Sequence, residues 1–131
     1  LLARPEATDE QIWTALADTG LSGWVENLPR GLDTLVGRDA GSEIPEGLRT
    51  PMALARAILQ DSRIMLIDEL PYEFLNSAAG RRFHGWLEER RGTSTIFYVT
   101  HRQDYIDLAD LVIQLHQDQR PQVKERKNGR R

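Results

Sequence analysis

The chain has 131 residues, 40% of them hydrophobic and 28% charged, which suits one compact domain with a hydrophobic core. The lack of cysteine excludes disulfides and thiolate zinc sites, and the formal charge of −3 argues against nucleic acid as the main partner. No apolar run approaches the roughly 20 residues that cross a bilayer. We expect a soluble piece of a longer protein, because the chain also opens at Leu1 without a methionine.

Two helices are predicted in the first part of the chain. Residues 8–11 read Thr-Asp-Glu-Gln, a capping box, and apolar residues at helical spacing follow up to Gly20, which suits a C-terminal cap. These signals predict a helix over residues 9–19. A second, short helix is expected to open at Ser22 and to stop at Pro29.

The following segment, residues 30–50, is rich in glycine, aspartate, arginine and serine and is predicted to be a long polar connection. Thr50 and Pro51 resemble an N-cap followed by proline at the first helical position, where the missing N–H of proline costs nothing. A third helix is therefore expected to begin at Pro51 and to end near Asp61.

Three apolar runs predict strands. Residues 64–67 form a continuous apolar run bounded by polar residues, typical of a parallel strand buried on both faces. Residues 95–99 and 111–115 predict two more strands. Between the first two, Asn76 and Ser77 can cap a helix that ends at Gly92. This strand–helix–strand order predicts a parallel pair with a right-handed crossover.

The residues after about 117 are polar and carry many basic side chains. A short final strand through Val123 is compatible with this composition. We expect a solvated basic terminus, and contact with acidic phospholipid or nucleic acid is the alternative.

Polar side chains follow the first two predicted strands. Asp68 and Glu69 come directly after the first strand, and Thr100 and His101 come after the second. Because ligands bind at the carboxyl ends of parallel strands, we expect these groups to converge on one crevice. Paired carboxylates suit a hydrated Mg²⁺ and an attacking water, and a histidine can orient a terminal phosphate. The alternative is that Asp68 and Glu69 merely cap the next segment and that His101 caps the helix from Arg102.

A phosphate cradle is needed as well, because Mg²⁺ rarely binds tightly through one or two carboxylates alone. No G-x-x-x-x-G-K-[ST] loop occurs in the chain. The residue pattern alone therefore gives an acid pair and a histidine without the phosphate cradle that a nucleotide site needs.

Four segments, in the right order, resemble the ATPase domain of ATP-binding-cassette (ABC) transporters. Residues 64–69 resemble the Walker B strand with its catalytic glutamate, and residues 99–102 resemble the switch-histidine segment. Residues 53–59 resemble the helix after the family signature motif. Residues 7–13 and 28–34 are similar to the helical subdomain of exporter-type members. The resemblance extends from about residue 3 to residue 116.

The resemblance implies an α/β fold, a partial P-loop NTPase (ABC ATPase) fold in which a helical subdomain precedes mostly parallel strands with flanking helices. Residues 1–62 would form the helical signature subdomain. Residues 63–117 would form the Walker B and switch-histidine part of the RecA-like core, and residues 118–131 a polar basic tail. The Walker A loop of the family is not in this chain.

The resemblance also implies roles for the polar residues. Asp68 would contact Mg²⁺ through water, Glu69 would be the general base for the hydrolytic water, and His101 would contact the γ-phosphate. The cofactors of the parent protein would be ATP and Mg²⁺, bound weakly or not at all by this fragment alone. Its partners would be a second ABC ATPase domain and a transmembrane domain, at the cytoplasmic face of the inner or plasma membrane. The parent would export an unknown substrate.

The chain departs from the family in two segments that act on the opposite subunit. The family signature Leu-Ser-Gly-Gly-Gln aligns with Ile44, Pro45, Glu46, Gly47 and Leu48. Pro45 removes a hydroxyl and an N–H, and Glu46 puts a negative charge where a phosphate should bind. In the D-loop, Leu75 replaces the aspartate of Ser-Ala-Leu-Asp, and Asn76 is a neighbouring polar substitute.

Asp68, Glu69 and His101, which would act on the nucleotide of their own subunit, are thus retained. The signature and D-loop segments, which would act on the nucleotide of the opposite subunit (in trans), are degenerate. This asymmetry predicts one half of a heterodimer, active only beside a partner with an intact signature. The alternatives are a drifted paralogue with little ATPase activity and a non-catalytic ABC domain that serves for dimerisation and coupling. ABC proteins without transport roles are disfavoured by the exporter-like segment over residues 7–34.

Overall fold

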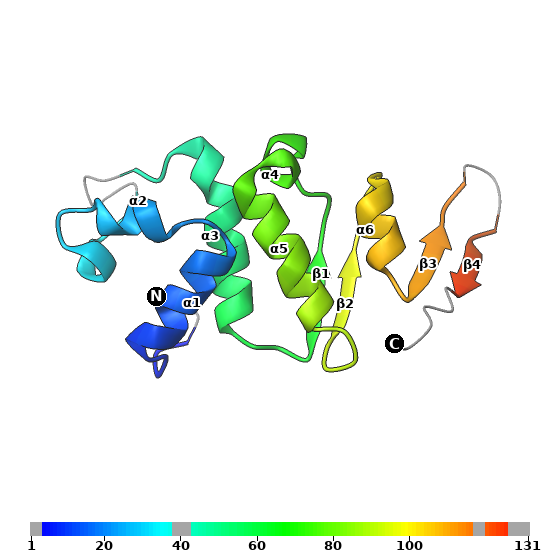
Figure 1. Ribbon diagram of the computed structural model, residues 1–131, viewed down its shortest axis with the longest axis horizontal. Helices are drawn as coiled ribbons and strands as arrows, with labels where there is room; N and C mark the ends of the chain where they lie inside the picture. The colour runs from blue at the N-terminus through cyan, green and yellow to red at the C-terminus, as the bar shows by residue number, and fades with distance from the viewer. Residues whose placement is uncertain (1–3, 38–42, 117–119, 126–131) are drawn as a thin grey trace. The chain divides into compact units, whose positions relative to one another are not determined.

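The computed structural model describes residues 4–37, 43–116 and 120–125, and the chain divides into two compact units after Val99 (Figure 1). The described elements of the first unit are α1 Asp9–Asp18, α2 Ser22–Glu26, the 3₁₀ turn η1 Gly31–Asp33, α3 Glu46–Leu59, β1 Ile64–Ile67, α4 Tyr72–Asn76, α5 Ala78–Glu89 and β2 Thr95–Tyr98. Those of the second are α6 Gln103–Leu108, β3 Leu111–Gln114 and β4 Gln122–Glu125. The three-part division at residues 62 and 117 stays a prediction.

Local signals define both ends of α1. The Thr8 hydroxyl accepts the N–H of Gln11 at 3.3 Å, and the Gln11 side chain accepts the N–H of Thr8 at 3.1 Å. At the other end, Gly20 has φ +74° and the N–H of Leu21 donates to the Leu16 carbonyl at 2.7 Å, as in a Schellman motif. The capping box and the glycine cap predicted from the sequence are therefore confirmed.

The helices of the first unit enclose an apolar cluster. Its buried members are Leu16, Leu21, Val25 and Ala55, and the half-buried side chains packed against them are Ile12, Trp13, Trp24, Leu32, Leu48 and Met52. Since α1, α2 and α3 all contribute, burial of this cluster stabilises the helical part far more than helix propensity does.

The predicted start of α3 is wrong. The helix begins at Glu46 with Pro45 as N-cap, and Pro51 lies inside it, so the last part of the expected connection is helical. Proline in a helix interior removes one backbone hydrogen bond and costs about 3 kcal/mol. However, Pro51 and four apolar side chains of α3 are buried, and each large one contributes about 1.5–3 kcal/mol on burial. Burial therefore outweighs the cost of the proline. Residues 38–42 of the same connection lie outside the described residues.

Strands β1 and β2 pair in parallel, with Leu66 opposite Phe97, which confirms the predicted pairing (Figure 1). The prediction that β1 is buried on both faces is wrong. Met65 and Ile67 are 7% and 8% exposed, whereas Ile64 and Leu66 are 66% and 78% exposed. The described residues thus cover one face of this sheet and leave the other to solvent.

Aromatic packing joins α4 to α5. Phe83 is fully buried, with its ring centroid 6.1 Å from Phe74 of α4 and 5.7 Å from Trp86. Gly80 permits the close approach, because a Cβ there would lie 2.3 Å from the Phe74 carbonyl oxygen and 2.7 Å from that of Leu75. Ser77 caps α5 through the N–H of Gly80 at 3.1 Å, as predicted, whereas the short helix α4 is not predicted from the sequence.

The second unit combines α6 with an antiparallel pair, β3 and β4, in which Ile113 lies opposite Val123. The predicted third strand and the short strand through Val123 are therefore confirmed. Among the strands that the structure describes, β1 and β2 are parallel and β3 and β4 are antiparallel, so the expectation of mostly parallel strands is met in part. Within the described part of the chain, no helix is both long and apolar enough to span a membrane.

Arg90 joins the ends of α3 and α5. Its Nη1 lies 2.5 Å from Oδ1 of Asp61, and its guanidinium lies 5.2 Å from the centre of the Trp86 ring. The hydrogen bond from Arg90, reinforced by its charge, lowers the pKa of Asp61. Asp18, the last residue of α1, behaves oppositely, because burial and the nearby charge of Glu89 raise its pKa.

We predict that Gly80→Ala lowers the free energy of unfolding by about 1–3 kcal/mol, because the added methyl group meets the two α4 carbonyls. Gly85→Ala is the matched control in the same helix, since a Cβ there meets no atom within 4 Å. It should raise stability by about 0.5–1 kcal/mol through helix propensity. Urea unfolding of the two variants measures both changes, and equal effects would contradict the close approach.

We also predict opposite pH-dependent effects for two aspartates. At neutral pH, Asp61→Asn should lower stability by about 0.5 kcal/mol, the scale of an exposed ion pair. The stability lost in the Asp61→Asn variant should shrink as the pH falls from about 5 toward 2, because a carboxyl with a lowered pKa stabilises the fold only while ionised. Asp18→Asn should instead raise stability at neutral pH. This gain should vanish as the pH falls, because the Asp18 carboxyl, whose pKa is raised, becomes protonated in the unsubstituted protein. Effects independent of pH would rule out this electrostatic origin.

Candidate functional site

The acid pair lies where β1 ends. Asp68 and Glu69 directly follow Ile67 and are both exposed. Oδ1 of Asp68 accepts the N–H of Glu69 at 2.8 Å, so the first carboxylate is oriented by the backbone of the second. The short separation in sequence and this bond keep the two side chains on one exposed turn at the end of the strand.

The Asp68 carboxylate fits the role of an outer ligand to hydrated Mg²⁺. An ionised carboxylate offers about four lone-pair sites, and the N–H of Glu69 uses one of them. Among the residues that the structure describes, no group of three or more His, Asp or Glu side chains is placed to hold a metal ion. Contact of hydrated Mg²⁺ with Asp68 stays a prediction.

The parallel ladder continues to the ends of both strands. The N–H of Val99 donates to the Ile67 carbonyl at 3.1 Å, so the chain leaves β1 and β2 at the same edge of the sheet. Thr100 and His101 come next in the chain but belong to the second compact unit. Convergence of the acid pair and His101 on one crevice stays a prediction.

His101 occupies the middle of a hydrogen-bonded turn. The Thr100 hydroxyl accepts the N–H of Arg102 at 3.1 Å. Arg102 in turn donates from Nε and Nη2 to the two carboxylate oxygens of Asp104, at 3.0 and 2.7 Å. These donors lower the pKa of Asp104. His101 itself is exposed.

The segment aligned with the family signature forms the N-terminus of α3. Pro45 is the N-cap and provides no side-chain bond, and the N–H of Leu48 donates to the Pro45 carbonyl at 2.9 Å. Glu46 and Gly47 are exposed in the first turn, and Leu48 packs on the apolar cluster around Leu16. The helix starts at Glu46 and not at Pro51 as expected, so the residues aligned with the family signature lie at a helix N-terminus. Ile44 is half-buried just before it.

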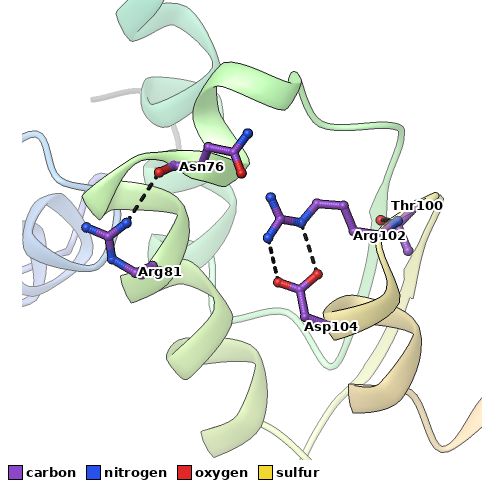
Figure 2. A network of polar contacts seen from close by, with 5 residues as sticks. All are labelled: Asn76, Arg81, Thr100, Arg102 and Asp104. Atoms are coloured by element: carbon purple, nitrogen blue, oxygen red, sulfur yellow. Dashed lines mark hydrogen bonds and ion pairs between the residues drawn. The ribbon is translucent and has the colours of Figure 1, made fainter.

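The segment aligned with the D-loop is the short helix α4. Leu75 is 8% exposed and faces the core beside Phe74, whereas Asn76 is exposed. The backbone carbonyl of Asn76 accepts Nη1 of Arg81 at 3.3 Å (Figure 2). The residue that replaces the family aspartate is therefore part of the hydrophobic core.

Two features of this region were not predicted from the sequence. One is α4, whose five residues give no clear helical period. The other is the Arg102–Asp104 pair, for which an arginine two residues before an acid at the start of a helix is the only signal. Such a signal is weak, because most exposed ion pairs contribute little.

Comparison with known proteins finds relatives over most of the chain. It is 32% identical over 111 residues to an ATP-dependent lipid A-core flippase of Vibrio cholerae, covering 85% of this chain and 19% of that protein. It is 35% identical over 115 residues to a flippase of the same name from Hahella chejuensis, and 34% identical over 114 residues to ABC transporter B family member 21 of Arabidopsis thaliana. These alignments cover 88% and 87% of this chain, and 19% and 9% of the two proteins. The chain is similar to ABC exporters over most of its length.

A solved structure shares the fold. A bacterial Atm1-family ABC exporter with ATP bound matches 86% of this chain and 19% of its own chain, with a TM-score of 0.65 at 21% identity. No protein-family model matches the chain. The chain spans about a fifth of the length of the two flippases and of this exporter.

Proposed function

We propose that this chain is the C-terminal part of the ATPase domain of an exporter-type ABC transporter. In this proposal the parent protein binds ATP with Mg²⁺ and hydrolyses it to export a substrate that the chain does not identify. The transported substrate would be recognised by membrane segments, and none of the described helices is such a segment.

One observation carries the proposal. In a chain similar to ABC exporters over about 85% of its length, an acid pair directly follows a strand that pairs in parallel with the next one. A solved ABC exporter also shares the fold over 86% of this chain. Acids at the carboxyl end of a parallel strand are placed where α/β proteins bind ligands.

In the parent protein, the residues would divide the chemistry. Mg²⁺ bound with ATP would polarise the phosphate oxygens, and Asp68 would hold one of its water ligands. Glu69 would accept a proton from the attacking water, and His101 would donate a hydrogen bond to the γ-phosphate. Hydrolysis would then need a phosphate cradle from the parent protein, and this fragment alone should bind ATP weakly.

The exposed face of β1 supports assembly with the rest of such a domain. Ile64 and Leu66 on β1 and Phe97 and Val99 on and after β2 are all more than half exposed. A continuous apolar run in a parallel strand is normally covered on both faces. Further strands and helices of the parent ATPase domain would cover this face, and its partners would be a transmembrane domain and a second ATPase domain. The proposed location is the cytoplasmic face of a membrane.

A non-catalytic ABC domain is the second candidate. It is favoured by Pro45 and Glu46 at the N-terminus of α3, because neither side chain can donate to phosphate, Pro45 has no N–H, and the charge of Glu46 repels an anion. The burial of Leu75 favours it as well, because a core leucine has no polar group to reach across a dimer interface. Such a domain would only dimerise and couple to transmembrane helices.

We predict that Glu69→Gln in the full-length protein, beside a partner with an intact signature, lowers steady-state ATP turnover at least about a hundredfold, the usual contribution of a general base. Binding of Mg–ATP should persist, because the amide keeps the size of the carboxyl group. The matched control is Glu88→Gln, an exposed glutamate of α5, which should leave turnover unchanged. Unchanged transport in the Glu69 variant would favour the non-catalytic domain.

We predict that the full-length protein hydrolyses ATP slowly as a homodimer and faster beside a partner with an intact signature. The double change Pro45→Ser and Glu46→Gly should raise homodimer turnover about tenfold or more, since a charge-assisted hydrogen bond to phosphate contributes about 1.5–3 kcal/mol. Serine also suits the N-cap position that Pro45 occupies. Turnover of the unmodified homodimer at normal family rates would rule out this asymmetric arrangement.

A further inference from the structure

The backbone on either side of His101 is tied down by side chains. The Thr100 hydroxyl accepts the N–H of Arg102, so one hydrogen bond closes a turn with His101 at its centre. Thr100 is half-buried, whereas His101 is exposed. The turn therefore holds the peptide units on both sides of the imidazole without covering it.

The guanidinium of Arg102 is held by Asp104. Both carboxylate oxygens of Asp104 accept hydrogen bonds from the guanidinium, at 3.0 and 2.7 Å, in a bidentate pair (Figure 2). The same guanidinium lies 5.8 Å from the centre of the Tyr105 ring, and Tyr105 is only 3% exposed. Bidentate geometry restrains an arginine in orientation as well as in distance.

The first turn of α6 completes this arrangement. The N–H of Ile106 donates to the Arg102 carbonyl at 3.0 Å, so Arg102 is the residue at which α6 begins. The side chain, the N–H and the carbonyl of Arg102 all have partners between Thr100 and Ile106. The residue after His101 is consequently fixed to α6, which is anchored by the buried Tyr105 and Leu108.

We propose that Thr100 and Asp104 are positioning residues that fix His101 for its contact with the γ-phosphate. The inference rests on the proposed function of His101. Thr100 fixes the turn through the Arg102 N–H, and Asp104 fixes the Arg102 side chain against α6. A histidine that must meet a phosphate within hydrogen-bond distance gains from a backbone held in advance, because misplacement by about 1 Å can cost a hundredfold in rate.

This arrangement also assigns Arg102 a structural task. Its Nε and Nη2 are occupied by Asp104, whose negative charge offsets that of the guanidinium. An arginine committed in this way contributes little attraction for a nucleotide phosphate. The substrate contact of this segment therefore falls to His101.

The first test compares Thr100→Val with Thr100→Ser in the full-length protein beside a partner with an intact signature. Valine keeps the branched shape but cannot accept the Arg102 N–H, whereas serine can. We expect valine to lower kcat about fivefold, the effect of one hydrogen bond, with the KM for ATP changed less than about twofold. Serine should restore the kcat. Thr14→Val, at an exposed position of α1, is the matched control and should change neither constant.

The second test compares Asp104→Asn with Asp107→Asn. Both changes remove one negative charge from exposed positions of α6, and Asp107 accepts a hydrogen bond from Gln103. We expect the Asp104 variant to lower kcat about fivefold and the Asp107 variant to leave it unchanged. Equal effects of the two variants would show that helix charge, and not the restraint of Arg102, is responsible, and would overturn the role of Asp104.

The third test repeats Thr100→Val and Asp104→Asn in a His101→Ala background. Residues that act only through His101 should have no further effect there, whereas residues that merely stabilise the fold should have the same effect in both backgrounds. Hydrogen exchange provides a readout that does not depend on turnover. The Arg102 amide should exchange roughly tenfold faster in the Thr100→Val variant and unchanged in Thr100→Ser.

The outcomes separate the two proposals. If His101→Ala leaves ATP turnover unchanged, or if the unmodified protein has no turnover beside an intact partner, the proposed function falls and this inference falls with it. If His101→Ala lowers turnover but Thr100→Val does not, only the inference is overturned. Equal exchange of the Arg102 amide in the valine and serine variants would likewise overturn the turn around His101 and leave the proposed function standing.

Discussion

Parallel pairing of β1 with β2 is the interaction on which the candidate site depends. The ladder runs from the Thr95 N–H, which donates to the Arg63 carbonyl at 2.8 Å, to the Val99 N–H, which donates to Ile67 at 3.1 Å. Because both strands run the same way, their carboxyl ends share one edge, and Asp68 leaves the sheet there. Burial of Met65 and Ile67 on one face holds the strand in register, since a slip by one residue would expose both.

The residues that depart from the family signature suit a stable helix better than a phosphate site. Glu46 places a negative charge in the first turn of α3, where the helix dipole favours an acid. Leu48 packs on the apolar cluster of α1 and α2, and Leu75 is buried in the core beside α5. Substitutions of this kind keep the fold while they remove polar groups that would act on another molecule. The proposed loss of function toward the opposite subunit is therefore compatible with retention of the fold and of the acid pair.

The acid pair and His101 are held by short-range contacts. Asp68 accepts the N–H of its own neighbour, and His101 is bracketed by a turn that closes within three residues. Local bonds of this kind form wherever the chain enters the right turn, so they persist when distant parts of a domain change. Pairing with β2 and the burial of Met65 and Ile67 fix the strand that leads into the Asp68 turn.

The sequence by itself determined the features that depend on near neighbours. The capping box at Thr8, the glycine at the end of α1, the strand at 64–67 and its parallel partner were all predictable from local pattern and element order. Only the tertiary structure decided where burial competes with local preference. It placed Pro51 inside a helix, because apolar contacts outweigh one lost hydrogen bond, and it left one face of β1 exposed, because a strand's pattern does not say what covers it.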